Sequence, residues 1–590
     1  MYAKNFCCWV MSAIFLAIIV TTSVIVATQQ QSLVSSSVTI YVPDDYAKIQ
    51  WAIDNATAGD TIIVKSGTYY EKVNVIKQLI LRGVDTGTDK PVVDTCGHGN
   101  AIELYADGIT LEGFNVTNSG STWYDSGIII HSSNNIISAN TISNNAYCIR
   151  IRGSSNINNN NIITGNIIRS NYGFGIHIDG YSSNNTITGN NVSSNSDSGI
   201  YLWYSNNNII SSNMISNNNR GLYFGSSCDN NTITDNMISS NNCGILLSRS
   251  KNNTLSSNTV TKTYTYNGLC LVESDNNIID GNTVSNNYDN GILLDRSKNN
   301  TISSNTIGNN ILKGIYLDST SNHNNIADNN ISSNYDDGIY LASSNSNTIA
   351  DNNVSNNDNG IYIGYSNSNK ICFNDFINNY NNVYSSDSSN NIWNSTEKIT
   401  YSYKGATYEN YMGNYWDDYP GNDAESDGIG DTPYSINTDK DNYPLMESWE
   451  TYFATVPLVF DMDSGTYPSI MGNHTGTIKP NHDVIVNRMY TYPCAGTGGH
   501  SEYVKFENAS WNITANWKGY KGDWHNITFD EHFTLYAGFE YNYTICTGSY
   551  PRIHHNKTLT VPDGEITCTE FIDANGKRYD DWIPAIKLFL

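Results

Sequence analysis

A short acidic segment, DAESDGIGD, has the spacing of a calcium-binding loop. Its carboxylates lie at Asp423, Glu425, Asp427 and Asp431. Carboxylate oxygens at alternate positions can converge on one cation, while Gly428 permits the sharp turn between them. The position where an EF-hand carries its bidentate glutamate is Tyr434. We therefore expect a Ca²⁺ site of modest affinity that is not an EF-hand, and the alternative is an acidic turn that binds no ion.

A second set of chemically capable side chains recurs at outward positions of an internal repeat, two and four residues after the start of each unit. The set comprises His131, Arg150, Arg152, His177, Asp179, Tyr201 and Trp203. Aromatic rings and arginines along one flat surface can hold an extended sugar by ring stacking and by hydrogen bonds at its edges. The alternative is a row of aromatic residues that only covers the strands, because such residues favour sheets.

The same positions have the residue types of an enzyme acting on an acidic polysaccharide. A lyase needs a base and a group, or Ca²⁺, that neutralises the uronate carboxylate. The candidates for these roles are Arg150, Arg152, His177 and Asp179. A hydrolase needs two carboxyl groups about 5 to 9.5 Å apart, and neighbouring repeat units offer no such pair. The sequence therefore assigns no catalytic residue.

The elements that must position these side chains are repeats. A glycine followed by Ile or Leu returns about every 22 to 24 residues, at Gly175, Gly199, Gly221, Gly244, Gly268, Gly291, Gly314, Gly338 and Gly360. Each unit reads G-I-x-L, then NNTI, then N-x-I-S-N-N, so its apolar residues alternate in short runs typical of strands. A period of this size with no room for a helix predicts a right-handed parallel β-helix of about a dozen coils, with Ile and Leu pointing inward.

Asparagine fits the corners of such coils. It adopts the left-handed backbone conformation more readily than other non-glycine residues. In stacked coils, equivalent side-chain amides can also form a hydrogen-bonded ladder. Asn213, Asn258, Asn282 and Asn305 each follow their unit's glycine by fourteen residues, which suits a ladder. An asparagine-rich disordered tract is excluded because the isoleucines keep register.

The chain divides into an export segment, a β-helix with caps, and a second domain. The boundaries that we predict are 1–30 for a signal peptide or retained membrane anchor, 38–384 for the β-helix, 44–57 for a capping helix with Asp44 or Asp45 as its N-cap, 385–450 for a closing cap that holds the acidic loop, and 456–590 for a β-sandwich. The last segment is rich in Tyr, Trp, His and Thr, with strand-like runs between Gly- and Pro-containing turns.

The net charge of −25 limits the partners. With 56 acidic and 31 basic residues, the chain lacks the Lys and Arg excess that nucleic acid binding requires. Cations and sugars are the expected partners. The nine cysteines after the export segment have no CxxC spacing, so no zinc site is indicated.

Two stretches resemble the NosD-type, pectin-lyase-like β-helix proteins. The opening, TIYVPDDYAKIQWAIDNATAGDTIIVKSGTYYEKVNVIKQLILRG, and the closing motif, GNYWDDYPGNDAESDGIGDTPYSI followed by DNYPLM, both have this likeness, which covers about residues 38–447. It implies the β-helix fold, but that fold hosts lyases, epimerases and non-enzymatic surface proteins. Residues 456–590 resemble modules of cell-surface proteins of methanogenic archaea, a likeness that implies no chemistry.

The NosD likeness also suggests copper handling, for which the sequence offers little. Met-rich and His-x-His clusters are absent, and the adjacent His554 and His555 would point to opposite sides of a strand. The expected function is that of an exported cell-surface protein with a structural or carbohydrate-binding role toward an extracellular or envelope glycan. The alternatives are a polysaccharide lyase or epimerase and a copper-related periplasmic protein. Sequons such as Asn473 and Asn512 make the last domain a candidate for glycosylation.

Overall fold

The structure of the protein is a computed structural model that describes residues 37–589 except 88, 123, 154–158, 438, 454–458, 466, 495–498, 510 and 520–524. The chain forms two compact units. The first runs to Lys398 and includes Tyr411–Met446, and the second comprises Ile399–Asn410 and the chain from Glu447 onward. Within the described residues, no helix is long and apolar enough to cross a membrane. The predicted export segment, 1–30, lies outside them.

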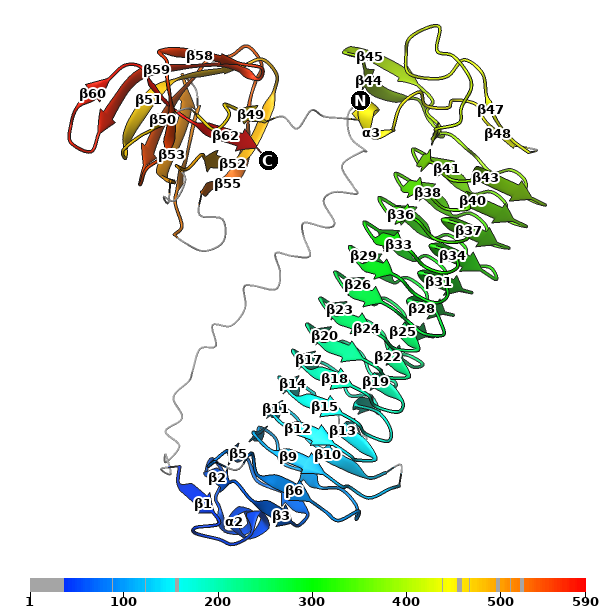
Figure 1. Ribbon diagram of the computed structural model, residues 1–590, viewed down its shortest axis with the longest axis vertical. Coiled ribbons are helices and arrows are strands. Elements are labelled where there is room, and N and C mark those ends of the chain that lie inside the picture. Colours follow the sequence, from blue (N-terminus) through cyan, green and yellow to red (C-terminus); the bar gives the residue numbers. More distant parts are fainter. Residues whose placement is uncertain are drawn as a thin grey trace. The chain divides into compact units, whose positions relative to one another are not determined.

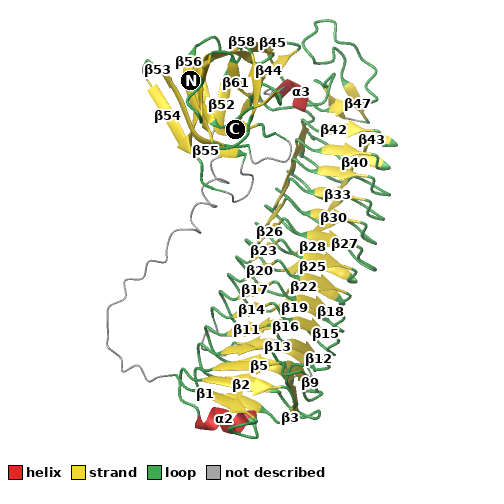
Figure 2. Ribbon diagram, turned by 60° about the vertical axis from the view of Figure 1, so that its left-hand side comes forward, coloured by secondary structure: helices red, strands yellow, loops and turns green. Residues whose placement is uncertain are grey.

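The first unit is a right-handed parallel β-helix whose wall consists of three sheets (Figures 1 and 2). Among the described residues, sheet A has 15 strands, from β1 (Thr39–Val42) to β41 (Lys370–Cys372). Sheet B also has 15, from β3 (Thr68–Tyr70) to β46 (Tyr415–Trp416), and sheet C has 14, from β4 (Val73–Val75) to β43 (Asn381–Ser386). Each coil passes through A, B and C in turn, so the predicted fold is confirmed.

The sheets hold more coils than the dozen expected. The first coils contain strands such as β2 (Thr61–Lys65), β5 (Ile80–Val84) and β8 (Thr110–Glu112), which pair in register with the later repeats. These coils lack the Gly-Ile start that marks the repeats from residue 127 onward, so counting repeats missed them. At about 4.8 Å per coil, 15 strands in a sheet correspond to a rod about 70 Å long.

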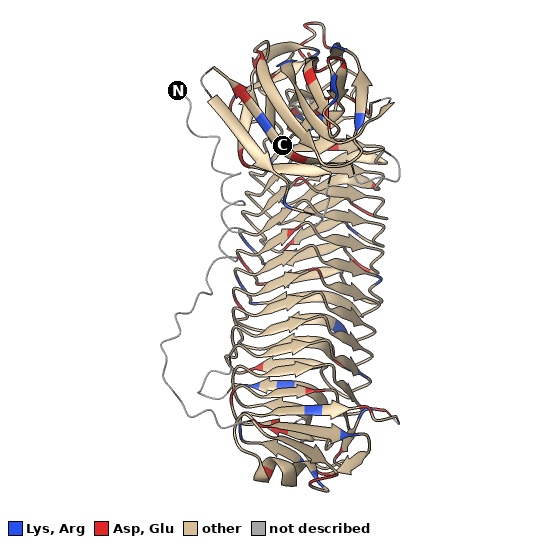
Figure 3. Cartoon of the chain, turned by 90° about the vertical axis from the view of Figure 1, so that its left-hand side faces the viewer, with Lys and Arg blue, Asp and Glu red and all other residues tan. Residues whose placement is uncertain are grey.

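The core of the β-helix is a stack of aliphatic side chains from the middle of each strand. Ile187, Ile233 and Ile292 are representative and fully buried. Outward neighbours such as Leu293 are only partly covered. Because the coils are in register, each inward residue packs on its equivalents above and below. Charged residues are sparse on the face of the rod turned to the viewer in Figure 3 and lie mostly along its edges.

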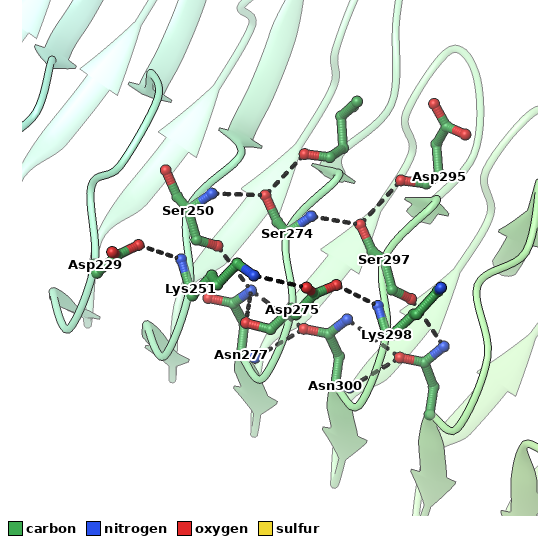
Figure 4. Close-up of polar contacts among 12 residues, drawn as sticks. Asp229, Ser250, Lys251, Ser274, Asp275, Asn277, Asp295, Ser297, Lys298 and Asn300 are labelled. Carbon is green, nitrogen blue, oxygen red and sulfur yellow. Dashed lines mark hydrogen bonds and ion pairs between the residues drawn. The ribbon is translucent and has the colours of Figure 1, made fainter.

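Buried asparagine ladders connect the coils, as predicted. The side-chain nitrogen of Asn258 donates to Oδ1 of Asn282 at 3.0 Å, and that of Asn282 donates to Asn305 at 3.0 Å. The same oxygen of Asn282 also accepts the backbone N–H of Asn258 at 2.9 Å. Figure 4 shows a neighbouring corner, where a serine ladder, Ser250 to Ser274 to Ser297, runs beside an asparagine ladder.

The left-handed corner residue is not the ladder asparagine but the residue before it. Ala139 and Asn144 have φ of 53° and 56°, and they precede the ladder members Asn140 and Asn145. The expected reason for the asparagines is therefore wrong for the ladder positions. Their amides satisfy buried backbone groups, whereas the left-handed positions accept Asn, Ser, Asp, Gly and others.

The N-terminal cap is shorter than predicted. Helix α2 spans Ile49–Asn55 and buries Ile49, Ala52 and Ile53. Its N-cap is Lys48, without a side-chain bond, so neither Asp44 nor Asp45 caps it. The carboxylate of Glu71 accepts the free N–H groups of Ile49 and Gln50 at 2.9 and 3.0 Å. A residue distant in sequence replaces the local cap, which the sequence pattern could not indicate.

The C-terminal end of the rod is closed by residues after the last coil. Asn414 extends the asparagine ladder by accepting from Asn374 at 2.9 Å, and Trp416 stacks on Phe376 of the last sheet B repeat. The buried carboxylate of Asp441 accepts N–H groups from Asn414 and Trp416. These contacts pair the exposed edge of the rod with protein, which prevents edge-to-edge association.

The second unit contains the predicted antiparallel sandwich. One sheet has the order β54-β53-β56-β51-β59-β58, and another has the order β49-β62-β52-β55. Their bounds are β49 Phe460–Asp461, β51 Gly472–Pro480, β52 Val484–Thr491, β53 Ser501–Asn508, β54 Trp511–Asn516, β55 Asn526–Leu535, β56 Tyr541–Thr547, β58 Thr558–Val561, β59 Gly564–Asp573 and β62 Ile586–Phe589. Residues of both sheets, including Val486 and Ile566, share one core.

Candidate functional site

The structure places the candidate residues in two outward columns of sheet C. The strands are β10 (Ser126–Ile130), β13 (Tyr147–Arg152), β16 (Ile176–Asp179), β19 (Ser198–Leu202) and β22 (Arg220–Phe224). Arg150 pairs with His177, and His177 pairs with Tyr201, so these three form the first column. Arg152 pairs with Asp179 in the second column. In-register parallel pairing therefore brings together residues that lie about 25 positions apart in the sequence.

An ion pair lies at the centre of these columns. The Arg150 guanidinium contacts the carboxylate of Asp179 at 2.7 Å, and the Arg150 side chain is only 10% exposed. The guanidinium also lies 5.9 Å from the ring centroid of Tyr147. A buried arginine that keeps one carboxylate partner is held in a fixed position, with donors still available for a second anionic or hydroxyl group.

His177 is the most unusual residue of the cluster. It is 8% exposed, and within the described part of the chain neither of its ring nitrogens has a hydrogen-bond partner. Burial lowers the pKa of the imidazole to about 4; Asp179 opposes the shift and Arg150 adds to it. His177 is therefore neutral at pH 7, and both of its ring nitrogens are buried, so a ligand reaches them only if the neighbouring rings move.

The aromatic residues around His177 stack on one another. Phe174 and Tyr201 have ring centroids 4.6 Å apart, and Tyr201 and Tyr223 follow at 4.9 Å with planes 19° apart. In such a ladder the ring faces are covered by neighbouring rungs, and the hydroxyl edges remain free. Burial raises the pKa of Tyr201, so its hydroxyl stays protonated. The column therefore offers edges and hydroxyl groups to a sugar, rather than the ring faces that the sequence suggested.

Trp203 departs from this ladder. Its ring is tilted by 49° from that of Tyr201, and its Cε3–Cζ3 edge fills the space in which a side chain at position 225 would lie. Residue 225 is glycine, and a Cβ there would come within 2.5 Å of the indole. The indole of Trp203 therefore packs against Gly225 of the next coil. Because it is partly exposed, it is the aromatic group of the set best placed for ring stacking with a ligand.

His131 belongs to a separate contact set at the N-terminal end of the columns. Its Nε2 lies 3.2 Å from the carboxylate of Glu103, and its ring stacks on Tyr105 with centroids 4.6 Å apart. Hydrogen bonds from His131 and Tyr105 lower the pKa of Glu103 to about 2. The sequence analysis missed Glu103, Tyr105, Phe174 and Tyr147. Coil alignment could have found Glu103, which pairs with Ile129, but the first coils lack the repeat signature.

The burial of His177 predicts an acid-sensitive β-helix. The folded-state pKa of His177, about 4, is lower than the ordinary value near 6.5. Between these two pH values the unfolded chain binds a proton that the folded chain does not. The stability that is present above pH 6.5 is therefore lost as the pH falls toward 4. We expect a loss of about 1.5 kcal/mol between pH 6.5 and pH 5 from this residue. Denaturant unfolding of the wild type and of His177→Phe at both pH values measures it. The variant should show a smaller pH dependence by that amount, and equal dependences would contradict the assignment.

The acidic loop closes on itself through its carboxylates. Asp423 accepts the backbone N–H groups of Asp427 and Gly428 at 3.1 and 2.8 Å, and Asp431 accepts that of Ala424 at 2.8 Å. Gly428 has φ of 88°, as the expected turn requires. In the described residues no three His, Cys, Asp or Glu side chains come close enough to hold a metal ion. In this arrangement the carboxylates of Asp423, Asp427 and Asp431 accept backbone N–H groups of the loop.

Calcium binding by this loop stays a prediction. If Asp423, Glu425, Asp427 and Asp431 rearrange around Ca²⁺, the ion should raise the melting temperature, because it binds the folded state only. Asp427→Ala should remove most of that increase, while Asp387→Ala, outside the loop, should keep it. Calorimetry with Ca²⁺ and with a chelator measures the difference. A calcium response that is unchanged in Asp427→Ala would rule out this loop as the site.

These features define a class of protein, a capped parallel β-helix that presents a polar and aromatic strip on one sheet. The sequence model of the NosD family, described as periplasmic copper-binding protein, matches residues 53–265 and 249–421. The chain belongs to this family, whose periplasmic description supports an exported protein. Among curated proteins, none is significantly similar to this chain.

Several solved structures are similar at low identity. The A-module of mannuronan C-5 epimerase AlgE4 from Azotobacter vinelandii is 16% identical, with 60% of this chain and 100% of that chain covered and a TM-score of 0.35. DFA-IIIase from Arthrobacter chlorophenolicus A6, without its lid and in complex with GF2, is 13% identical, with coverages of 53% and 94% and a TM-score of 0.37. The Dettilon tailspike protein is 12% identical, with coverages of 87% and 94% and a TM-score of 0.39. None of these likenesses indicates what this chain binds.

The copper suggested by the family description does not fit the described residues. His474 is fully buried, and its Nδ1 lies 3.1 Å from the carbonyl oxygen of Trp582. His500 stacks on Trp517, and His555 lies near Asp581. These histidines do not gather with other ligands into a group of three within the described part of the chain. No copper chemistry is therefore assigned to this protein.

Proposed function

We propose that the protein is an envelope protein that binds an extracellular polysaccharide through sheet C. The observation that supports this most is the fixed polar and aromatic surface around the Arg150–Asp179 pair, with its ladder of ring edges and the seated indole of Trp203. Guanidinium and hydroxyl donors bind sugar hydroxyl and carboxylate groups, and an indole stacks on sugar C–H groups. The polymer lies along the rod, because both columns run from coil to coil.

Retention on immobilised polysaccharides tests this function. Trp203→Ala should weaken retention on the polymer that binds by about 1 to 2 kcal/mol, or roughly 5- to 30-fold, because a partly exposed ring outside the core contributes to ligand contact. The panel should include polygalacturonate, alginate and neutral glucans. Tyr335→Ala, which removes a ring that is 83% exposed and belongs to neither column, is the matched control and should bind as the wild type does.

A second variant tests the seat of the indole without removing it. Gly225→Ala puts a methyl group where the Trp203 ring lies, so the ring must move. We expect retention to fall toward that of Trp203→Ala, with no change in the unfolding midpoint beyond a small loss. The binding proposal would be wrong if both variants were retained as strongly as the wild type, or if the wild type were retained on no polymer.

A second candidate function is that of a lyase or epimerase acting on acidic polysaccharide. It is favoured by the neutral imidazole of His177, which has no partner among the described residues and lies beside a buried arginine. In such an enzyme the rings of Phe174 and Tyr201 would move away from His177. His177 would then accept the proton next to the uronate carboxylate, and Arg150 would stabilise the resulting charge. If incubation produces unsaturated chain ends or epimerised units, His177→Gln should reduce the rate about 10²- to 10⁴-fold while retention survives.

A further inference from the structure

A hollow on sheet B, away from the sheet C columns, has the features of a second binding site. It encloses about 650 Å³ and lies over the strands β9 (Asn115–Thr117), β12 (Thr141–Ser143), β15 (Ile167–Arg169) and β18 (Asn191–Ser193). Asp89 and Lys90 form its rim. A concave site with a few convergent polar groups is where small ligands usually bind.

The floor of the hollow has one charge in a column of hydroxyl groups. After Asp94, the equivalent outward positions of sheet B are Thr117, Ser143, Arg169, Ser193, Ser216, Ser239, Thr261 and Ser285. Arg169 is exposed, and among the described residues its guanidinium has no ion pair or hydrogen bond. A guanidinium that serves no internal contact, surrounded by the hydroxyls of Ser143 and Ser193, is available to a ligand.

The rim is held in place by the preceding turn. Asp85 accepts the N–H groups of Gly87 and Asp89 at 2.7 and 3.1 Å, and Ser66 accepts that of Thr86 at 2.8 Å. Asp89 has φ of 104°, which is uncommon for a residue with a side chain. The Lys90 ammonium reaches across to the carbonyl oxygen of Ala139 at 2.8 Å. The wall of the hollow is therefore formed before any ligand arrives.

The charge and the surface of the hollow indicate the kind of ligand. Lys90 and Arg169 against Asp89 leave one net positive charge, in a chain whose net charge is −25. Ile167 is 42% exposed and adds an apolar surface, and Asn115 and Asn191 add carboxamides. A planar guanidinium binds a carboxylate through two parallel hydrogen bonds, while hydroxyl and amide groups bind sugar hydroxyls.

We infer that this hollow binds an acidic sugar unit, with Arg169 on the carboxylate of a uronic acid and the surrounding hydroxyls and carboxamides on its hydroxyl groups. The site is independent of the sheet C surface, so it does not rest on the function proposed for that surface. A polymer bound at both faces would be held at two points, which lengthens its residence time on the protein without further contacts at either site.

Calorimetric titration of the full chain with trigalacturonic acid tests this inference. The wild type should bind the trisaccharide with an affinity that decreases with added salt, and it should not bind maltotriose of the same length. Arg169→Gln should weaken binding at least 10-fold, and Arg169→Lys should recover only part of it because an ammonium lacks the planar fork. Ser239→Ala, in the same column three strands further along sheet B, should bind as the wild type does.

A blocking variant and an inorganic anion complete the test. Ser143→Phe fills the hollow and should also abolish binding, while an unchanged melting temperature shows that the rod is intact. Equal binding by Arg169→Gln, no binding by the wild type, or competition by sulfate at the concentration of the trisaccharide would each overturn the assignment. To separate the two faces, Trp203→Ala should leave trisaccharide binding at Arg169 unchanged.

Discussion

Ile292→Asn is expected to destabilise the β-helix by about 3 kcal/mol or more. Ile292 is fully buried in β31 (Ile292–Asp295) and lies between the equivalent Leu269 and Ile315 of the adjacent coils. The substitution would place a carboxamide among hydrocarbon side chains, where its hydrogen-bonding groups would have no partner. Denaturant unfolding followed by far-ultraviolet circular dichroism measures the loss.

Leu293→Asn is the matched control for that experiment. Leu293 is the next residue on the same strand, but it points outward and is only partly covered. We expect a loss of less than about 1 kcal/mol, because the new carboxamide can bind water. Similar losses in the two variants would contradict the inward and outward assignment of this strand, and with it the register of the whole stack.

Asn282→Leu is expected to cost about 3 to 6 kcal/mol, although it makes the side chain more apolar. Oδ1 of Asn282 accepts two N–H groups of Asn258, and its Nδ2 donates to the carbonyl oxygens of Leu255 and Asp280 and to Asn305. Leucine fills the space but leaves these buried groups without partners, at about 1 to 3 kcal/mol each before relaxation.

Asn325→Leu provides the comparison for the ladder. Asn325 starts β35 (Asn325–Ala327) and is exposed, so its amide can be replaced at a cost within about 0.5 kcal/mol. The difference in the free energy of unfolding between the two variants measures the contribution of the ladder, because both variants place a leucine in or next to a strand. If Asn282→Leu were as stable as the wild type, the ladder would be a consequence of coil stacking that adds nothing to the stability of the β-helix.

The functional proposals differ in how much of each could be read from the sequence. The sheet C columns were visible because their members recur at fixed positions after Gly127, Gly175 and Gly199. The hollow on sheet B was not, because Arg169 looks like any surface arginine in the sequence. Its meaning depends on the neighbouring hydroxyl groups of Ser143 and Ser193 and on Asp89 and Lys90, which come from the first coils and line the same hollow.

The sequence by itself determined the repeat, the strand pattern, the inward isoleucines and the asparagine ladders of this protein. These follow from local periodicity, since each coil repeats the same alternation of apolar and polar residues and must stack on its neighbours to bury them. The antiparallel sheets of the last segment were also readable, because its composition and turn residues differ from those of the repeats.

Only the tertiary structure decided which groups meet across coils and which atoms remain available. Glu71, and neither Asp44 nor Asp45, binds the helix N-terminus, because the coil brings a distant carboxylate to the free N–H groups. Tyr201 and Tyr223 of sheet C present their edges because the coil spacing stacks their rings face to face, whereas Tyr340 and Tyr362 further along the sheet meet edge to face. The ring nitrogens of His177 have no hydrogen-bond partner among the described residues, whereas Arg150 has the carboxylate of Asp179. The register of the coils decides both. Register between coils fixes these pairings, and it depends on contacts between residues more than 20 positions apart, which no local pattern encodes.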